Sequence, residues 1–291
     1  MPTSPCAIEQ FRAYLERRNY APHTLDSDPL DLQVFFATSA QPPEGISFRE
    51  IDRCIEAQQQ QGLSPATINR RLYALKHVFD FRIDHQLVGA NPVKPSHVLR
   101  RSRALPRALS QEQLEPLFAQ IQHPMDTALF LLMLRCGLRV SEAAQLKLQD
   151  IDWSQQAVRV DQGKGRKDRQ VYLSADTVAS LQECLKQRPR GVPGEAMFWN
   201  QKRPHRPLSV KAIQKKMERC ATAAGVAASC HRLRHTFASH LLEQGAEIIA
   251  IKELLGHASI GSSERYAKVS NQKVKQVYLK TIGKVMQQSN V

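Results

Sequence analysis

Long hydrophobic runs are missing from this sequence of 291 residues. No stretch of about 18 consecutive apolar residues occurs, and a transmembrane helix would need one. The first residues, MPTSPCAIEQFRAYLERRNY, mix charged and apolar side chains and lack the apolar core of a signal peptide. We therefore expect no membrane-spanning segment and a cytoplasmic location.

Paired cysteines are absent too. The 6 cysteines are scattered along the chain, and none forms a CxxC motif. This spacing argues against a zinc ribbon and against a disulfide framework. Glycine-rich nucleotide loops are also missing, because neither GxxxxGK[ST] nor GxGxxG occurs. We expect neither a metal nor a cofactor.

Positive charge is abundant. Lys and Arg total 41 against 27 Asp and Glu, which gives a net charge of +14, and most of this excess lies after residue 108. Hydrophobic residues make up 42% of the chain, enough for a sizeable core. A strongly basic protein favours a polyanionic partner, either nucleic acid or an anionic membrane surface. Composition alone does not choose between the two.

Residues 1–98 are predicted to form a helical domain. The stretch SPATINRRLYALKHVFDFRIDH opens with Ser64 as a candidate N-cap and Pro65 at the first helical position. Apolar side chains then recur at helical spacing: Ile68, Leu72, Leu75 and Phe79. Other faces carry the basic residues Arg70, Arg71 and Lys76. These bases fit a solvated helix face or contacts to DNA phosphates equally well.

Residues 99–109 are predicted to be a basic linker. Prolines that break regular structure lie before it, at Pro92 and Pro95, and within it, at Pro106. It also contains Arg100, Arg101, Arg103 and Arg107. A soluble linker and a segment lying along a DNA backbone are both compatible with this composition.

Residues 110–291 are predicted to be a second domain, mainly helical with a small β-sheet. A helix starts after Ser110, and a strongly apolar helix breaks at Gly137 before a second helix capped by Ser141. The stretch AVRVDQGKGRKDRQVYL alternates apolar and polar residues around a Gly/Lys-rich turn, which predicts a β-hairpin. Helices are predicted in four later segments: SVKAIQKKMERCATAAG, HTFASHLLEQG, EIIAIKELLGH and KVKQVYLKTIGKVMQQ.

The segment CHRLRHTFASH concentrates histidines and arginines. His231 and His235 share a helix face, but a zinc protease would need HExxH, and Arg232 occupies the glutamate position. Helix N-termini attract anions, so His231 with Arg234 at the leading edge of a helix indicates a phosphate site.

A phosphate site that performs chemistry needs further groups. Arg139 can donate two parallel hydrogen bonds to phosphate oxygens, and Lys164 on the glycine-rich turn can protonate a leaving oxygen. Downstream, the stretch LLGHASIGSSERYAKVS supplies His257 and Tyr266, whose phenol is a candidate nucleophile. Taken singly, each of these residues also fits a purely structural role.

As a set, these residues resemble the tyrosine recombinase (phage integrase) family, most closely its Xer-type members. The resemblance rests on four stretches, GLRVSEAAQLKLQDID, GKGRKDRQVYL, HRLRHTFASHLLEQGAEIIAIKELLGHASI and ERYAKVS. The stretch LSPATINRRLYALKHVFDF resembles the family's core-binding domain. The resemblance implies an N-terminal helical, SAM-like DNA-binding domain followed by an α+β catalytic domain.

The resemblance also implies roles. Tyr266 would attack the scissile phosphate and form a 3′-phosphotyrosyl link. Arg139 and Arg234 would clamp the phosphate oxygens, while Lys164 would act as the general acid. The supporting residues would be His231 for proton transfer, His257 for a phosphate hydrogen bond and Glu142 for orientation. We expect DNA contacts from the basic residues Arg70, Arg71, Lys76, Arg100, Arg101, Arg103, Arg166 and Lys167.

The implied function is site-specific DNA recombination without metal or ATP, since the phosphotyrosyl bond stores the energy for rejoining. The partner would be double-stranded DNA with an inverted-repeat-like core site, bound by a homotetramer or by a heterotetramer with a second recombinase. Residues 271–288 would link the protomers. Two alternatives stay open, a topoisomerase IB-type nicking-closing enzyme and a non-catalytic DNA-binding protein.

Overall fold

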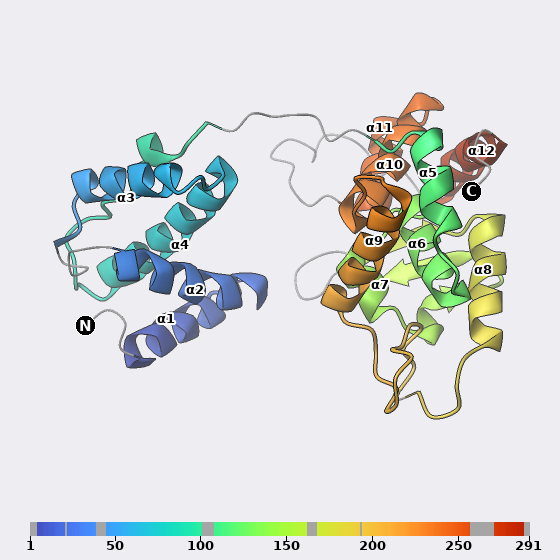
Figure 1. Ribbon diagram of the computed structural model, residues 1–291, viewed down its shortest axis with the longest axis horizontal. Coiled ribbons are helices and arrows are strands. Elements are labelled where there is room, and N and C mark those ends of the chain that lie inside the picture. The colour runs from blue at the N-terminus through green and yellow to red at the C-terminus, as the bar shows by residue number, and fades with distance from the viewer. Residues whose placement is uncertain are drawn as a thin grey trace. The chain divides into compact units, whose positions relative to one another are not determined.

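The computed structural model describes residues 5–20, 22–38, 45–100, 108–161, 168–192, 194–256 and 271–287. The chain divides into two compact units, Met1–Ala104 and Leu105–Val291 (Figure 1). The division falls within the basic stretch for which the sequence predicts a linker.

The first unit is helical throughout its described residues. Its elements are α1 (Pro5–Arg17), α2 (Pro22–Thr38), α3 (Phe48–Gln60), α4 (Pro65–Asp84) and a 3-10 turn, η2 (Pro95–His97). The longest of them, α4, starts where the sequence predicts, because the Ser64 hydroxyl accepts from the Thr67 amide at 3.2 Å and Pro65 follows. The predicted apolar stripe of α4 is buried and faces α1, α2 and α3.

Eight helices make up most of the described part of the second unit. They are α5 (Gln111–Ala119), α6 (Pro124–Arg135), α7 (Val140–Gln145), α8 (Ala175–Lys186), α9 (Val210–Ala224), α10 (Cys230–Glu243), α11 (Ile248–Leu255) and α12 (Asn271–Gln287). Nine of the twelve residues of α6 are buried, and the helix packs against α8 and α10. A helix that is apolar on all sides belongs in the core, and α6 lies at the centre of this unit.

A small antiparallel sheet completes the second unit. After a short 3-10 turn, η3 (Leu148–Asp150), come the strands β1 (Ile151–Asp152), β2 (Ala157–Val160) and β3 (Arg169–Tyr172), in spatial order β1-β2-β3. Val158 of β2 pairs with Val171 of β3, and both are buried. The β2–β3 hairpin confirms the sequence prediction, as does the mainly helical fold with its small sheet.

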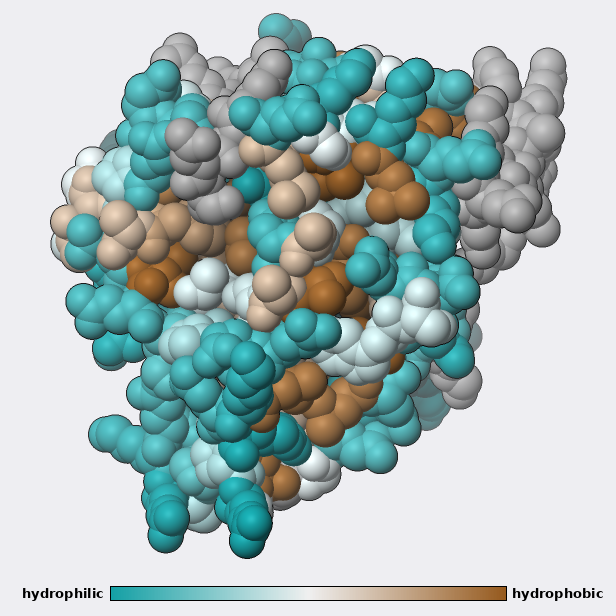
Figure 2. All heavy atoms as spheres, turned by 90° about the vertical axis from the view of Figure 1, so that its right-hand side faces the viewer, coloured by the Kyte–Doolittle hydropathy of each residue, from teal (hydrophilic) through white to brown (hydrophobic). Residues whose placement is uncertain are grey.

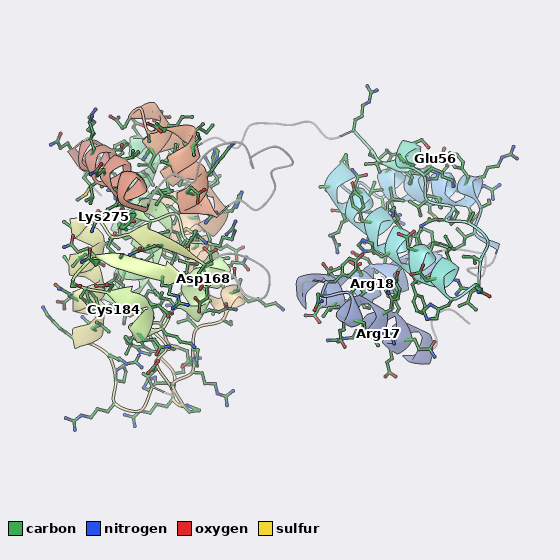
Figure 3. The ribbon with its side chains drawn as sticks, turned by 180° about the vertical axis from the view of Figure 1, so that it is seen from behind. Arg17, Arg18, Glu56, Asp168, Cys184 and Lys275 are labelled. Carbon is green, nitrogen blue, oxygen red and sulfur yellow. The ribbon has the colours of Figure 1, made fainter. Side chains whose placement is uncertain are left out.

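The last helix, α12, packs on its own unit. Tyr278, Ile282 and Val285 are buried in the core, and the Tyr278 hydroxyl donates to the Arg135 carbonyl at 3.0 Å. Lys275 of α12 donates to the Gln155 side chain at 3.1 Å, beside the sheet (Figure 3). The apolar face of α12 is therefore covered by its own chain.

Hydrophilic side chains dominate the face shown in Figure 2, with smaller apolar areas between them.

None of the helices in the described ranges combines the length and the hydrophobicity that crossing a lipid bilayer requires.

Candidate active site

Gly137 makes the corner between α6 and α7. Its φ is +68°, a left-handed conformation that glycine adopts without steric cost. The next amide, that of Leu138, donates to the Leu132 carbonyl at 3.2 Å and closes the end of α6. A β-carbon at position 137 would lie 2.5 Å from the ring of Phe237, so packing as well as backbone conformation requires glycine here. The chain runs from this corner directly into Arg139.

Arg139 and Glu142 hold each other at the start of α7. The Arg139 amide donates to Oε2 of Glu142 at 2.6 Å, and Nη1 of Arg139 donates to Oε1 at 2.7 Å. The prediction that Ser141 caps this helix is wrong. The N-cap is Arg139, and the Glu142 carboxylate reaches back to its amide. The Arg139 guanidinium is thereby fixed relative to its own backbone.

Arg234 lies in the second turn of α10 and is only 5% exposed. The helix begins where the Ser229 hydroxyl accepts from the Arg232 amide at 3.2 Å. Nη1 of Arg234 donates to the Gly137 carbonyl, and Nη2 donates to the Leu255 carbonyl at 2.6 Å. Two separate segments therefore hold this guanidinium in one orientation.

A third arginine, Arg169 at the start of β3, belongs to the same cluster. It donates to both oxygens of Glu142, from Nη1 to Oε1 at 2.8 Å and from Nη2 to Oε2 at 2.7 Å. Its Nε donates to the Leu254 carbonyl at 2.7 Å. The sequence analysis did not name this residue.

The C-terminal end of α11 binds all three arginines. The last carbonyls of a helix lack partners within the helix and form the negative end of its dipole. Here each of three consecutive carbonyls accepts from a different arginine: Leu254 from Arg169, Leu255 from Arg234, and Gly256 from Arg139 at 3.1 Å. This arrangement sets the three guanidinium groups around the single carboxylate of Glu142.

The cluster keeps its charges despite burial. Burial alone would raise the pKa of Glu142, but hydrogen bonds and charge from Arg169, together with hydrogen bonds from Arg139, lower it to about 2. Burial and then the charge of Arg139 lower the pKa of Arg234 to about 9, which still leaves it protonated at neutral pH. Three positive charges thus surround one negative charge.

A cleft of about 620 Å³ opens next to this cluster. Arg139, Arg234 and His231 line it, and His231 is exposed in the first turn of α10. Helix α9 also lines the cleft, through Gln214, Met217 and Glu218. The structure therefore brings together three residues that the sequence analysis selected from two distant segments. No grouping of three or more His, Cys, Asp or Glu side chains suited to a metal ion occurs within the described ranges.

The other predicted catalytic residues, Lys164, His257 and Tyr266, lie outside the described residues. The same holds for four predicted DNA-contacting residues: Arg101, Arg103, Arg166 and Lys167. In the described part of the β2–β3 hairpin, Arg159 forms ion pairs with two carboxylates beside the turn. The distances are 3.1 Å to Asp161 and 2.9 Å to Asp168, which is labelled in Figure 3.

The predicted DNA-contacting bases of α4 all have partners inside their own unit. Arg70 pairs with the buried Asp31, Arg71 donates to the Gln58 side chain at 2.9 Å, and Lys76 donates to Asp80 at 2.7 Å. Arg70 and Lys76 still expose about half of their side chains, at 48% and 50%, whereas Arg71 exposes only 16%. Arg100 is exposed at the end of the unit.

A sequence signal for Arg169 did exist. Residues two apart on a strand point to the same face of the sheet, so Arg169 shares a face with Val171. Both are buried, at 9% and 0% exposure. An arginine at an inward strand position requires a buried acidic partner. The alternating pattern that predicts the hairpin therefore also predicts an internal carboxylate for Arg169.

Comparisons with known proteins give one consistent result. Residues 107–273 match the sequence profile of the phage integrase family, and residues 8–86 match that of the phage integrase N-terminal SAM-like domain. Tyrosine recombinase XerC of Chromobacterium violaceum is 30% identical over 280 residues, covering 94% of this chain and 93% of that protein.

Two solved structures share the fold. One is the Tn1549 transposon integrase in complex with circular intermediate DNA, with a TM-score of 0.71 and 20% identity over 92% of this chain and 98% of that one. The other is a lambda integrase tetramer bound to a Holliday junction, with a TM-score of 0.69 and 18% identity over 90% of this chain and 79% of that one.

Proposed function

The chain belongs to the phage integrase family and is a site-specific tyrosine recombinase, and we propose how its residues divide the reaction. The proposal rests on one observation: Arg139, His231 and Arg234 line a single cleft, and the two arginines are held in place by Glu142 and by backbone carbonyls.

The two arginines of the cleft bind the nonbridging oxygens of the scissile phosphate. Negative charge grows on these oxygens as a fifth oxygen approaches phosphorus, and fixed cations stabilise that charge. A guanidinium donates two parallel hydrogen bonds to such oxygens, which a lysine cannot do. Because carbonyls and Glu142 already orient Arg139 and Arg234, little reorganisation is needed when the phosphate arrives.

Tyr266 is the nucleophile of the proposed reaction. Its phenolic oxygen forms a bond to phosphorus while the bond from phosphorus to the 5′-oxygen breaks. Lys164 gives a proton to the departing 5′-oxygen, and His231 accepts the phenolic proton. His257 donates a hydrogen bond to the phosphate. Reversal of these steps with a 5′-hydroxyl from another strand completes the exchange, and the phosphotyrosyl bond supplies the energy.

The partner of the proposed reaction is duplex DNA with an inverted-repeat-like core, bound by four protomers. The net charge of +14 supports a polyanionic partner. The fold is shared with an integrase in complex with DNA and with a tetramer on a Holliday junction, which agrees with this assembly. The exposed bases Arg70, Lys76 and Arg100 would contact phosphates from the first unit.

The proposed domain limits separate the DNA-binding part of the chain from the catalytic part. Residues 1–98 form the core-binding domain, 99–109 the basic linker and 110–291 the catalytic domain. The break between the two compact units, after Ala104, supports a linker in this stretch.

Covalent trapping tests the proposal. The protein first selects its site from a pool of random-sequence duplexes. That site is then prepared as a set of duplexes with a single nick at varied positions, so that cleavage near the nick releases a short fragment and prevents rejoining. We expect a covalent adduct with wild type and none with Tyr266→Phe, at unchanged DNA affinity.

Tyr278→Phe is the matched control. It removes a buried hydroxyl that donates to the Arg135 carbonyl at 3.0 Å and does not line the cleft, so adduct formation should persist. A supercoiled plasmid with two copies of the site separates recombination from simple relaxation. Products that are relaxed but never recombined would contradict strand exchange between two sites.

A further inference from the structure

Arg169 is a buried ionic side chain whose contacts all point into the protein. Its side chain is 6% exposed, and it grips both oxygens of Glu142 and the Leu254 carbonyl. It does not line the cleft that Arg139 and Arg234 border. A phosphate in that cleft would therefore meet Arg139 and Arg234 but not Arg169.

We infer that Arg169 is a positioning residue for the phosphate clamp, the pair formed by Arg139 and Arg234. It acts through Glu142 and the end of α11. This inference rests on the proposed function of the cleft. Arg139 takes its orientation from Glu142 and the Gly256 carbonyl, and Arg234 from the Gly137 and Leu255 carbonyls. Arg169 is bonded to both Glu142 and α11, so it fixes the two supports relative to each other.

The free energy of folding does not by itself explain why Arg169 and Glu142 form a buried ion pair. Replacing a buried ion pair with apolar side chains of similar volume is often neutral or stabilising. The bidentate pair of Arg169 and Glu142 is instead well suited to specify geometry, because a planar guanidinium fixes both carboxylate oxygens at once. Its two hydrogen bonds to Glu142, 2.8 and 2.7 Å long, leave that carboxylate little freedom to turn.

The charge of the cluster supports the same role. Three arginines and one glutamate leave two net positive charges beside the cleft, which matches the charge that develops on a phosphodiester during attack. Without Arg169 the surplus would be halved, and Glu142 would draw Arg139 and Arg234 more strongly toward itself. Arg169 therefore satisfies the carboxylate so that the clamp arginines remain available to phosphate.

Among the described residues, three arginines face Glu142. Arg139 faces it from α7, Arg169 from β3 and Arg234 from α10, the last at 3.7 Å. A second cavity that Glu142 borders carries further charged side chains: Lys147, Asp150, Arg159, Asp161 and Glu195. Since Arg169 supplies the largest opposing effect to burial, its loss raises the pKa of Glu142.

The test measures single-turnover cleavage of the nicked duplex, with DNA affinity and helical content measured in parallel. We expect Arg169→Gln to cleave on the order of 100-fold more slowly, the loss typical of small misplacements of catalytic groups. Arg169→Lys keeps the charge but not the fork, so it should lose roughly 10-fold. Affinity for DNA should change little, because Arg169 does not border the cleft.

Arg188→Lys is the matched control. Arg188 also donates to two backbone carbonyls, those of Ala196 at 2.6 Å and Gly194 at 3.1 Å, but it contacts neither Glu142 nor α11. It should cleave at the wild-type rate. Equal losses in Arg188→Lys and Arg169→Lys would show a general effect of weakening the fold and would overturn the inference.

A double-mutant cycle with Glu142→Gln and a pH profile test positioning directly. If Arg169 acts through Glu142, adding Arg169→Gln to the Glu142→Gln variant should slow cleavage by less than about threefold. If the two residues act independently, the rate losses of the single variants should multiply in the double variant. In the single variant Arg169→Gln, the fall in cleavage on acidification should begin at a higher pH than in wild type, because loss of Arg169 raises the pKa of Glu142. If Arg169→Gln does not fold, the cycle and the pH profile are run with Arg169→Lys.

The outcomes separate this inference from the proposed function. Failure of the wild type to form any adduct would refute the proposed function. Adduct formation by the wild type, with full-rate cleavage and an unchanged pH profile in Arg169→Gln, would refute the role of Arg169 alone.

Discussion

Gly137→Ala should damage stability and the phosphate clamp together. The left-handed backbone at this position costs an L-residue about 1–2 kcal/mol, and forcing a methyl group into a packed core adds roughly 1–3 kcal/mol. The methyl carbon would lie 2.5 and 2.6 Å from two carbons of the buried Phe237 ring and 3.2 Å from Leu255. We therefore expect a loss of about 3–4 kcal/mol, since neither contact can be relieved by a flexible surface side chain.

Thermal unfolding measures this loss. In a unit of this size a loss of about 3–4 kcal/mol corresponds to a fall in Tm of roughly 6–16 °C. The orientation of Arg234 should also change, because its guanidinium donates to the carbonyls of both Gly137 and Leu255. Cleavage of the nicked duplex by the folded variant should slow by about tenfold or more, in keeping with small misplacements.

Gly225→Ala is the control that isolates packing. Gly225 has a similar φ of +65° as the C-cap of α9, but a β-carbon there would meet nothing within 4 Å. It should lose only about 1–2 kcal/mol and keep its cleavage rate. Equal losses in the two variants, or a Gly137→Ala protein with wild-type Tm and cleavage, would refute the packing argument.

Three further predictions concern Glu142 and α12. Because folding lowers the pKa of Glu142 from 4.5 to about 2, its contribution of about 3 kcal/mol is complete above pH 4.5 and is lost as pH falls toward 2. The stability difference between wild type and Glu142→Gln in urea titrations should therefore shrink over that range, and a constant difference would contradict this. Tyr278→Phe should lose about 1 kcal/mol by the same measurement, because one buried hydrogen bond disappears; no loss would count against that bond. Leu279 is 45% exposed on α12, so if this helix links protomers, Leu279→Glu should reduce recombination while leaving stability and single-site binding unchanged; equal loss of binding and recombination would argue against such a link.

Local signals made much of the fold predictable. Ser64 and Pro65 mark the start of α4, and the apolar spacing that follows defines its buried face. The alternation around the glycine-rich turn predicts the β2–β3 hairpin. In each case one short segment carries both the pattern and its cause, so no knowledge of distant residues is needed.

Contacts between distant segments set the limit of sequence reasoning. Ser141 has the residue type of an N-cap, yet Glu142 provides the cap because its carboxylate is fixed by Arg169, 27 positions further along the chain. Likewise Arg139 and Arg234 could be selected by residue type, but their attachment to the end of α11 depends on how three segments meet. Such convergence follows from packing of the whole unit.

The position of α12 illustrates the same limit. Its apolar residues indicate that one face of the helix is covered. The sequence does not reveal whether the same chain or another chain covers it. The structure buries Tyr278, Ile282 and Val285 within the same unit. A role for residues 271–288 in linking protomers would therefore require α12 to use its exposed face or to leave this position.

Identification of the covalently attached tyrosine tests the central claim most directly. The wild-type protein is trapped on the nicked duplex, the adduct is digested with a protease and a nuclease, and the modified peptide is sequenced by mass spectrometry. The account predicts a 3′-linked nucleotide on Tyr266. A nucleotide on any other residue, or a 5′-phosphate linkage, would contradict it.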